Sequence, residues 1–268
     1  EIGSGLVGSE MCIRDRISTM SGGNQYIQDD AIGTVDTMMR GTQGIASGGT
    51  GTVSTMSAGY QRIVSGGIGT ISTMLEGIQD ISSGGTGTVN IMNSGAQEIS
   101  GGVGIIAVMS GGQQGIKSGG TGIVSTMVTG VQAIFNGEGT VSLMSGDGYQ
   151  YIDSGGTGTV VTMTSGEQNI YSDGTGTVST MNDGGQYITS GTGTISTMSG
   201  GYQDISSGTG TVSTMSGGEQ NINSGGTGMI DTMFGGTQVM SSGIGTGTIN
   251  TMNSGLQWLL SGGTGTID

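Results

Sequence analysis

Apolar residues recur at fixed intervals from residue 17 to the end of the chain, in units 17 to 19 residues apart. Three positions before one Met in each unit stands Val or Ile. Gln follows that Met after five residues in thirteen units and after six residues at Gln150, and two residues beyond Gln comes an apolar residue, nearly always Ile. The unit therefore reads T-[VI]-S-T-M-S-G-G-x-Q-x-I-x-S-G-G-T-G. Its fourteen Met anchors are Met20, Met38, Met56, Met74, Met92, Met109, Met127, Met144, Met163, Met181, Met198, Met215, Met233 and Met252.

Such a unit predicts strands joined at glycine corners. The segments between glycine clusters are short and rich in Val, Ile, Thr, Tyr and Gln, which are largely strand residues. Helical coils are disfavoured, because each Gly costs a helix about 1 kcal/mol relative to Ala. Length changes fall mainly in the glycine clusters, at 145–150, 189–194, 206–211 and 241–248, where no ladder hydrogen bond is lost.

Self-similarity on this scale predicts an all-β fold, a single-stranded parallel β-helix (β-solenoid) of about 14 coils of 17–19 residues. Coils stack about 4.8 Å apart, so we expect a rod. Val, Met and Ile are expected to line one continuous apolar interior. The Val-to-Met spacing of three breaks strict alternation and predicts a bend or bulge between them, whose place the spacing leaves open.

Gln and Ile stand two residues apart in each unit and therefore share one face of a strand. If Ile points inward, the amides form a structural ladder in which each Gln donates to and accepts from its neighbours. The alternative is an outward stripe that binds a polar partner. The Gln column comprises Gln25, Gln43, Gln61, Gln79, Gln97, Gln114, Gln132, Gln150, Gln168, Gln186, Gln203, Gln220, Gln238 and Gln257.

Composition narrows the classes of function. The formal charge of −14 argues against nucleic acid and anionic membrane surfaces as partners. No apolar run approaches the length that spans a bilayer. His is absent, which removes the commonest general base and metal ligand, and Cys12 has no second Cys to pair with. We expect no cofactor, no metal and no enzymatic activity.

Residues 1–16, "EIGSGLVGSEMCIRDR", match no unit. The words "GLVGSEMCIRDR" resemble a translated sequencing-adapter artefact, and the alternative is a divergent cap. We therefore expect a repeat domain over 17–268 that is a fragment of a longer protein.

Other motifs are weaker. The calcium-binding nonapeptide G-G-x-G-x-D would need a column of carboxylates, but its sixth position reads Val or Ile, and Asp80, Asp153 and Asp204 are interpreted as solvated surface. "GGQQGIKS" (111–118) lacks phosphate-loop spacing. Thr-Gly-Thr rows are the pattern of some ice-binding solenoids, but Ile68, Ile123, Glu138 and Met229 interrupt them.

The stretch "SGTGTVSTMSGGEQNINSGGTG" (207–228) resembles the repeats of AIDA-type autotransporter adhesins. These combine S-G-G corners, a G-G-x-Q-x-[VI] strand and a Thr-rich strand, and the likeness covers essentially all of 17–268. The chain departs from the family in having Met where Val is frequent, and in a unit one residue shorter.

The resemblance implies a right-handed β-helical passenger at the cell surface, tethered to the outer membrane through a barrel that this stretch does not include. Family members mediate attachment to host cells, self-aggregation or biofilm formation, and some are heptosylated on serines by dedicated transferases. The implied partners are host-cell or bacterial surface components, a second copy, or a heptosyltransferase. The corresponding corner serines here are Ser47, Ser65, Ser83, Ser118, Ser154, Ser224 and Ser261.

The sequence therefore favours a non-enzymatic adhesin or aggregation module with multivalent contacts along a rod. Aromatic residues near the Gln column are either contact points or cross-coil stacking partners: Tyr60, Tyr149, Tyr151, Tyr187, Tyr202 and Trp258. The alternatives are a structural spacer, stalk or surface-layer repeat and, less favoured, an ice-binding solenoid.

Overall fold

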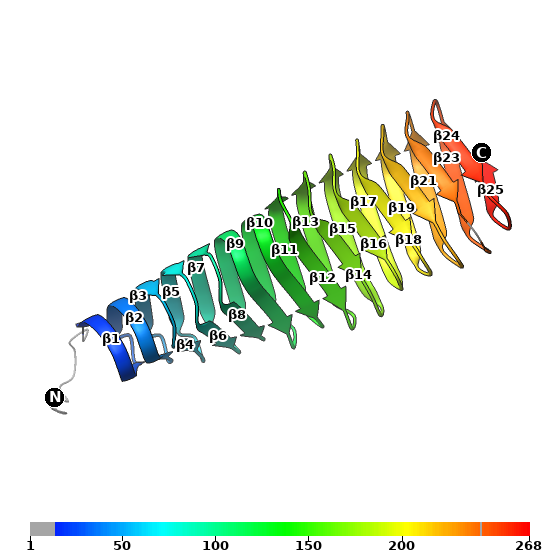
Figure 1. The fold of residues 1–268 in the computed structure, drawn as a ribbon. Coiled ribbons are helices and arrows are strands. Elements are labelled where there is room, and N and C mark those ends of the chain that lie inside the picture. Colours follow the sequence, from blue (N-terminus) through cyan, green and yellow to red (C-terminus); the bar gives the residue numbers. More distant parts are fainter. Residues whose placement is uncertain (1–13, 242) are drawn as a thin grey trace.

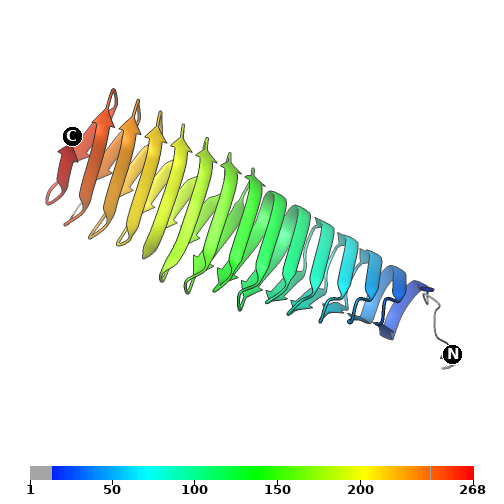
Figure 2. The same cartoon turned by 180° about the vertical axis from the view of Figure 1, so that it is seen from behind.

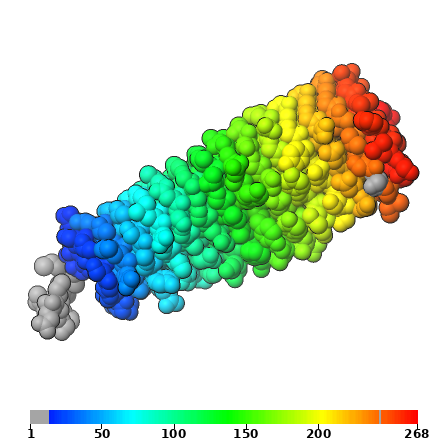
Figure 3. All heavy atoms as spheres, viewed as in Figure 1, coloured from blue at the N-terminus to red at the C-terminus, as the bar shows by residue number. Residues whose placement is uncertain are grey.

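The computed structural model describes residues 14–241 and 243–268. These residues form 25 β-strands and no helix, joined in one parallel sheet that winds into a rod (Figure 1). The space-filling view shows the same elongated shape (Figure 3). The predicted β-solenoid with one unit per coil is confirmed. Residues 1–13 lie outside the described part, so most of the adapter-like segment does too, while Arg14–Arg16 already belong to the first strand.

Each coil has a long strand that runs through T-G-T-[VI]-S-T-M and a short strand that carries x-Q-x-I. In four coils the two merge: β1 (Arg14–Ile27), β2 (Ile32–Ile45), β9 (Val103–Lys117) and β10 (Thr121–Phe135). The separate long strands are β3 (Thr50–Met56), β5 (Ile68–Met74), β7 (Thr86–Met92), β11 (Glu138–Met144), β13 (Thr157–Met163), β15 (Gly174–Met181), β17 (Gly191–Met198), β19 (Thr209–Met215), β21 (Thr227–Met233), β23 (Thr246–Met252) and β25 (Thr264–Ile267).

The separate short strands are β4 (Tyr60–Ile63), β6 (Ile78–Ser82), β8 (Ala96–Ser100), β12 (Gly148–Asp153), β14 (Glu167–Ile170), β16 (Gly185–Ile188), β18 (Tyr202–Ile205), β20 (Glu219–Ile222), β22 (Thr237–Met240) and β24 (Leu256–Leu259). Long strands pair with long strands and short with short, so equivalent residues of successive coils lie in register, as in Val53 with Ile71 and Gln61 with Gln79. Seen from behind, the long and short strands form two faces of the rod (Figure 2).

The pairing places the expected bend. In β3 and β5, Val53 pairs with Ile71 and Thr55 with Thr73, but Ser54 is skipped. Ser54 and Thr55 then both face outward, while Val53 and Met56 are fully buried. The irregularity therefore sits at the residue after Val, and it is what brings Met back to the interior after three positions instead of two.

The apolar interior is divided in two, which corrects the expectation of one continuous core. The Val/Ile and Met columns form one buried cluster, and the Ile column of the short strands forms another. Between Met and Ile along each coil lies the buried Gln, so a polar column accompanies the two apolar clusters.

The glycine inside each long strand makes room for that polar column. A Cβ on Gly51 would lie 2.7 Å from Gln43 Oε1 and closer still to Ile45 Cδ1. The inward position between two outward Thr residues therefore has to be Gly, because the facing short strand fills the space there.

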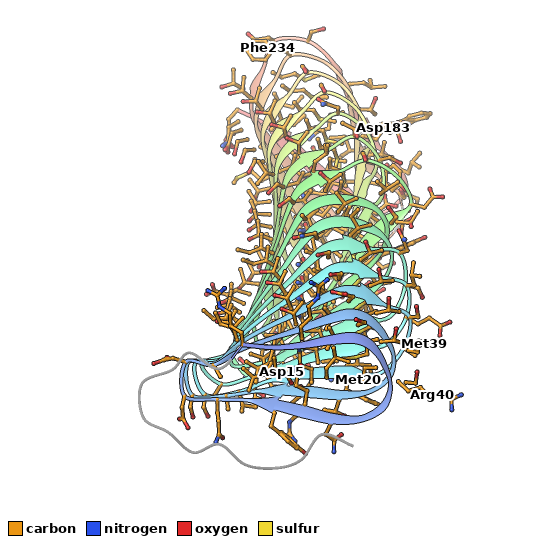
Figure 4. All side chains as sticks on the ribbon, turned by 90° about the vertical axis from the view of Figure 1, so that its left-hand side faces the viewer. Asp15, Met20, Met39, Arg40, Asp183 and Phe234 are labelled. Atoms are coloured by element: carbon orange, nitrogen blue, oxygen red, sulfur yellow. The ribbon has the colours of Figure 1, made fainter. Side chains whose placement is uncertain are left out.

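Viewed along the rod from its N-terminal end, each coil is a flattened loop (Figure 4). Met20 lies inside its rounded corner, while Met39 and Arg40 of the next coil project outward there. The other corner is the S-G-G turn, where Ser47 and Gly48 have φ of 50° and 79°. Within 14–241 and 243–268, the structure contains no helix with the length and apolar character to cross a membrane.

Candidate binding face and corner serines

The Gln side chains form a hydrogen-bonded column along the rod. Each Nε2 donates to the Oε1 of the Gln one coil earlier, at 2.6 to 2.8 Å from Gln43 through Gln257. Longer contacts of 3.3 to 3.5 Å reach backbone carbonyls of the long strands, such as Gly51 O and Thr70 O for Gln61. From Gln43 to Gln238 these side chains are fully buried, so they face the interior and offer no stripe to a partner.

The column has a direction. One N–H of each side-chain amide points toward the N-terminal end, where Gln25 donates to the Asp15 carboxylate at 2.9 Å. Asp15 stands at the register position that Gly33 occupies in the next coil. In this first coil the Asp15 carboxylate, at the position of an inward glycine, accepts the hydrogen bond that the Gln of the preceding coil accepts elsewhere in the column.

The long strands present what we call the threonine face, which comprises their outward Thr and Ser residues. Its Thr rows run in register, for example from Thr34 to Thr52 to Thr70. Ile68, Glu138 and Met229 lie within these rows as the sequence placed them, and Ile105 and Ile123 interrupt a row side by side.

The short strands present a face whose outward residues differ from coil to coil, which we call the variable face. It consists of the residues one before, one after and three after each Gln. All seven Tyr and the one Trp of the chain lie at these positions, in or directly after the short strands: Tyr26, Tyr60, Tyr149, Tyr151, Tyr171, Tyr187, Tyr202 and Trp258.

Some of these aromatic side chains stack between coils. Tyr151 lies between Phe135 and Tyr171, with ring centroids 5.7 and 4.9 Å away, and Tyr187 packs edge-on against Tyr202 at 5.2 Å. Tyr26, Tyr171 and Phe135 were not among the aromatic residues predicted to lie near the Gln column. Their spacing from Gln was the signal that would have found them.

Others are available for contact. Tyr60 and Tyr149 are 52% and 41% exposed, and Trp258 is 54% exposed. Stacking between coils is thus found for some of the aromatic residues, while the exposed ones are accessible and their role as contact points stays a prediction.

Two tyrosines sit in an acidic setting. The Tyr151 hydroxyl donates to Asp153 at 2.9 Å, and this bond, with burial and the carboxylate charge, raises the pKa of Tyr151. Burial opposes ionisation of Asp153, but the donors Tyr151 Oη and Ser154 N leave the pKa of that carboxyl lowered. Burial, the hydrogen bond with Tyr202 and nearby charges raise the pKa of Tyr187.

The three Asp residues considered as calcium ligands lie apart in the rod. Asp80 is 3.8 Å from Arg62, and Asp153 accepts from Tyr151 and Ser154. Asp204 pairs in register with Tyr187, and its Oδ1 is buried without a hydrogen-bond partner among the described residues. In the described ranges no three His, Cys, Asp or Glu side chains gather closely enough to hold one metal ion.

The seven corner serines are all exposed and stand at the S-G-G turns between a short strand and the next long strand. Four have positive φ between 49° and 53°: Ser47, Ser65, Ser118 and Ser154. This left-handed conformation is uncommon for residues other than Gly. Ser47 N donates to Ser65 O and Ser65 N to Ser83 O, so the corners stack in a row along the rod.

No family model and no curated protein matches the chain. Among solved structures it is similar to the hyper-glycosylated TibA 55–350 fragment, glycosylated by TibC, with a TM-score of 0.83 and 27% sequence identity. The match covers 95% of this chain and 99% of that fragment. The resemblance to AIDA-type passenger repeats is thereby confirmed.

Proposed function

We propose that this chain is a non-enzymatic, adhesin-type autotransporter passenger, displayed at the cell surface, that makes multivalent contacts along a repetitive rod. The observation that carries the proposal is the match to the TibA fragment over nearly the whole of both chains. The regularity of the coils agrees with a contact surface, since the described residues repeat one cross-section along the rod.

The variable face supports multivalency. Aromatic side chains suit contact surfaces because they bury much area with few rotatable bonds. Here all Tyr residues and Trp258 lie on one face, at intervals set by the coil. Weak contacts on one rigid body reinforce one another, because after the first contact each further contact is intramolecular.

The corner serines extend the proposal to glycosylation. The TibA fragment carries sugars added by TibC. In this chain, Ser47, Ser65 and Ser118 project from exposed turns, spaced by whole coils, where a transferase can approach. We propose that a heptosyltransferase is a partner and that the seven corner serines are the acceptors.

A coil-deletion series tests the adhesin function. Removing residues 50–67, or 50–85, joins Gly49 to Ile68 or Thr86 and restores the S-G-G-x-G corner, so register is kept. With the rods displayed on cells, attachment and clumping should fall as coils are removed. The deletions 50–85 and 175–208 each remove two coils from different parts of the rod. Equal effects on attachment would show that coil number matters, and unequal effects would show that local sequence matters.

Unchanged attachment and clumping across the series would contradict the proposal. That result would favour a spacer or stalk, in which the number of coils sets only the length of the rod. Equal cell-surface amounts of every variant, measured with a terminal tag, are the necessary control.

A further inference from the structure

A groove of about 240 Å³ lies on the variable face between Tyr149 and Tyr202. Carboxylates from three neighbouring coils border it: Asp147, Glu167 and Asp183. Its remaining lining is glycine and serine, so the aromatic walls and the carboxylates supply its chemistry.

The register of the coils fixes the walls. Tyr149, Glu167, Gly185 and Tyr202 follow one another in a single column of paired residues. A Cβ on Gly185 would lie 2.5 to 2.9 Å from the ring and hydroxyl of Tyr202, so the missing side chain lets that ring lie over Gly185. The hydrogen bond and the edge contact with Tyr187 hold the ring of Tyr202 in this orientation.

The charge around the groove has one sign. Residues 118–268 contain ten Asp and Glu and no Lys or Arg. The ion pairs of the described residues all lie before this stretch: Arg16–Asp36, Arg62–Asp80 and Lys117–Glu98. The groove carboxylates therefore face solvent without a cation from their own chain.

Two other grooves of the rod differ in this respect. One is bordered by Tyr26 and Arg62 and the other by Met39 and Arg40, so both carry an arginine. The groove at Tyr149 and Tyr202 is set apart from these two by its purely acidic and aromatic border.

The carboxylates are also spaced for a ligand larger than a metal ion. They do not form a cluster of three that could hold a metal, within the residues the structure describes. One oxygen of Asp183 already accepts from Gly184 N at 2.8 Å, which leaves its charge but reduces its free acceptor sites.

We propose that this groove binds arginine side chains of a basic, extended segment of a partner protein. A guanidinium stacks on Tyr faces and donates to carboxylates in one plane, which matches aromatic walls combined with carboxylates. The uniform negative charge of residues 118–268 attracts such a segment from a distance. This inference names a partner class for the proposed adhesin, and its test needs no cell attachment, so the two can fail separately.

The test measures binding of a fluorescein-labelled peptide of alternating arginine and serine to the purified chain by fluorescence anisotropy. The double variant Tyr149→Ala/Tyr202→Ala should bind about tenfold more weakly. Glu167→Gln/Asp183→Asn should weaken binding by a similar factor at low salt, and the difference should shrink as salt screens the charges. Tyr202→Phe keeps the ring and should bind within about twofold of the unaltered chain.

The matched control is Tyr60→Ala/Glu76→Gln. Tyr60 has the same position relative to Gln as Tyr149, and Glu76 the same position relative to Met as Asp183, but both lie in the half of the rod that contains the basic residues. This variant should bind the peptide unchanged. Far-UV circular dichroism of each variant verifies that the rod is intact.

Several outcomes would overturn the proposal. One is unaltered peptide binding by Tyr149→Ala/Tyr202→Ala. Another is that the control variant weakens peptide binding equally, which would mean that binding depends on the overall negative charge of the chain and not on this groove. Competition by a neutral oligosaccharide would make the groove a sugar site, and self-association that requires Tyr149 and Tyr202 without peptide binding would make it a contact between copies.

Discussion

The side-chain amide of Gln25 donates to the carboxylate of Asp15 at 2.9 Å, at the N-terminal end of the buried Gln column. Thirteen successive amide bonds follow, all in the same direction. A negative charge at the donor end of aligned dipoles is stabilising, as it is at a helix N-terminus. Asp15 therefore acts on the column as a cap.

Replacing Asp15 with Ala should loosen the first coil. Since Asp15 is exposed, we expect a loss of about 1 kcal/mol or less, confined to the N-terminal end. Hydrogen exchange should quicken at the backbone amides of Gln25 and Ile27 and stay unchanged at those of Gln132 and Ile134. Asp29→Asn, which removes another exposed carboxylate of the same region, is the control; equal effects of both variants would contradict the cap.

A break in the middle of the column should cost more. Gln132 donates to Gln114 and accepts from Gln150, each at 2.7 Å, and is fully buried. Gln132→Leu leaves Gln114 Oε1 without its amide donor and leaves Gln150 Nε2 only its longer backbone contacts, for which we expect about 2 to 4 kcal/mol of lost stability in urea denaturation. Gln257→Leu at the half-exposed end, with one Gln neighbour, should cost less than about 1 kcal/mol. Equal losses of stability in the two variants would contradict a stabilising role of the buried amide hydrogen bonds.

The inward glycines give a second contrast. A Cβ on Gly139 would meet Ile134 Cδ1 and lie 2.8 Å from Gln132 Oε1, whereas a Cβ on Gly22 meets nothing within 4 Å. Gly139→Ala should therefore lower the free energy of unfolding by about 2 kcal/mol or more, because overpacking displaces the short strand. Gly22→Ala should change it by less than about 0.5 kcal/mol. A tolerated alanine at position 139 would mean that the two strands do not approach as closely as described.

Alkaline titration addresses the tyrosine pair. Burial, the hydrogen bond with Tyr202 and nearby charges raise the pKa of Tyr187 above its ordinary value of about 10. The folded chain thus holds this proton more tightly than the unfolded chain. The resulting stabilisation is complete below about pH 10 and is lost as the pH rises through the folded-state pKa. Tyrosinate absorbance should show a late component that Tyr187→Phe removes and that guanidinium unfolding abolishes; a single transition in the folded chain would contradict it.

Glycosylation is tested by mass. Produced together with a heptosyltransferase of the kind the resemblance implies, the chain should gain mass in multiples of one heptose. Ser65→Ala, at an exposed corner, should lower the maximum by one addition, while Ser54→Ala, on the threonine face, should leave it unchanged. An unmodified intact mass, or loss of an addition with Ser54→Ala, would remove the corner serines from the proposal.

Much of the rod follows from its periodicity. Val53, Met56 and Ile63 stand at fixed intervals, and in parallel stacked coils equal spacing becomes equal position. The alternation of Gln61 and Ile63 likewise predicts that both point inward, and both are buried. Local pattern suffices here because each coil contacts only its neighbours.

Other features depend on how the two strands of a coil face each other, which one strand's pattern does not contain. The spacing of Val and Met demands a bend, but only the pairing places it at Ser54. The separation of the interior into two apolar clusters arises because Gly51 admits the Gln43 amide between them. The groove between Tyr149 and Tyr202 needs Gly185, whose role is visible only when four coils are stacked.

The one-way amide column makes the two ends of the rod chemically different. At the N-terminal end the amide hydrogen of Gln25 is bonded to the Asp15 carboxylate, whereas at the C-terminal end Gln257 presents its amide oxygen. A further coil that carries Gln can extend the column only at its C-terminal end, because the amide hydrogen at the N-terminal end is already bonded to Asp15. The hydrogen-bonded column is therefore polar, with one closed end and one end that can grow.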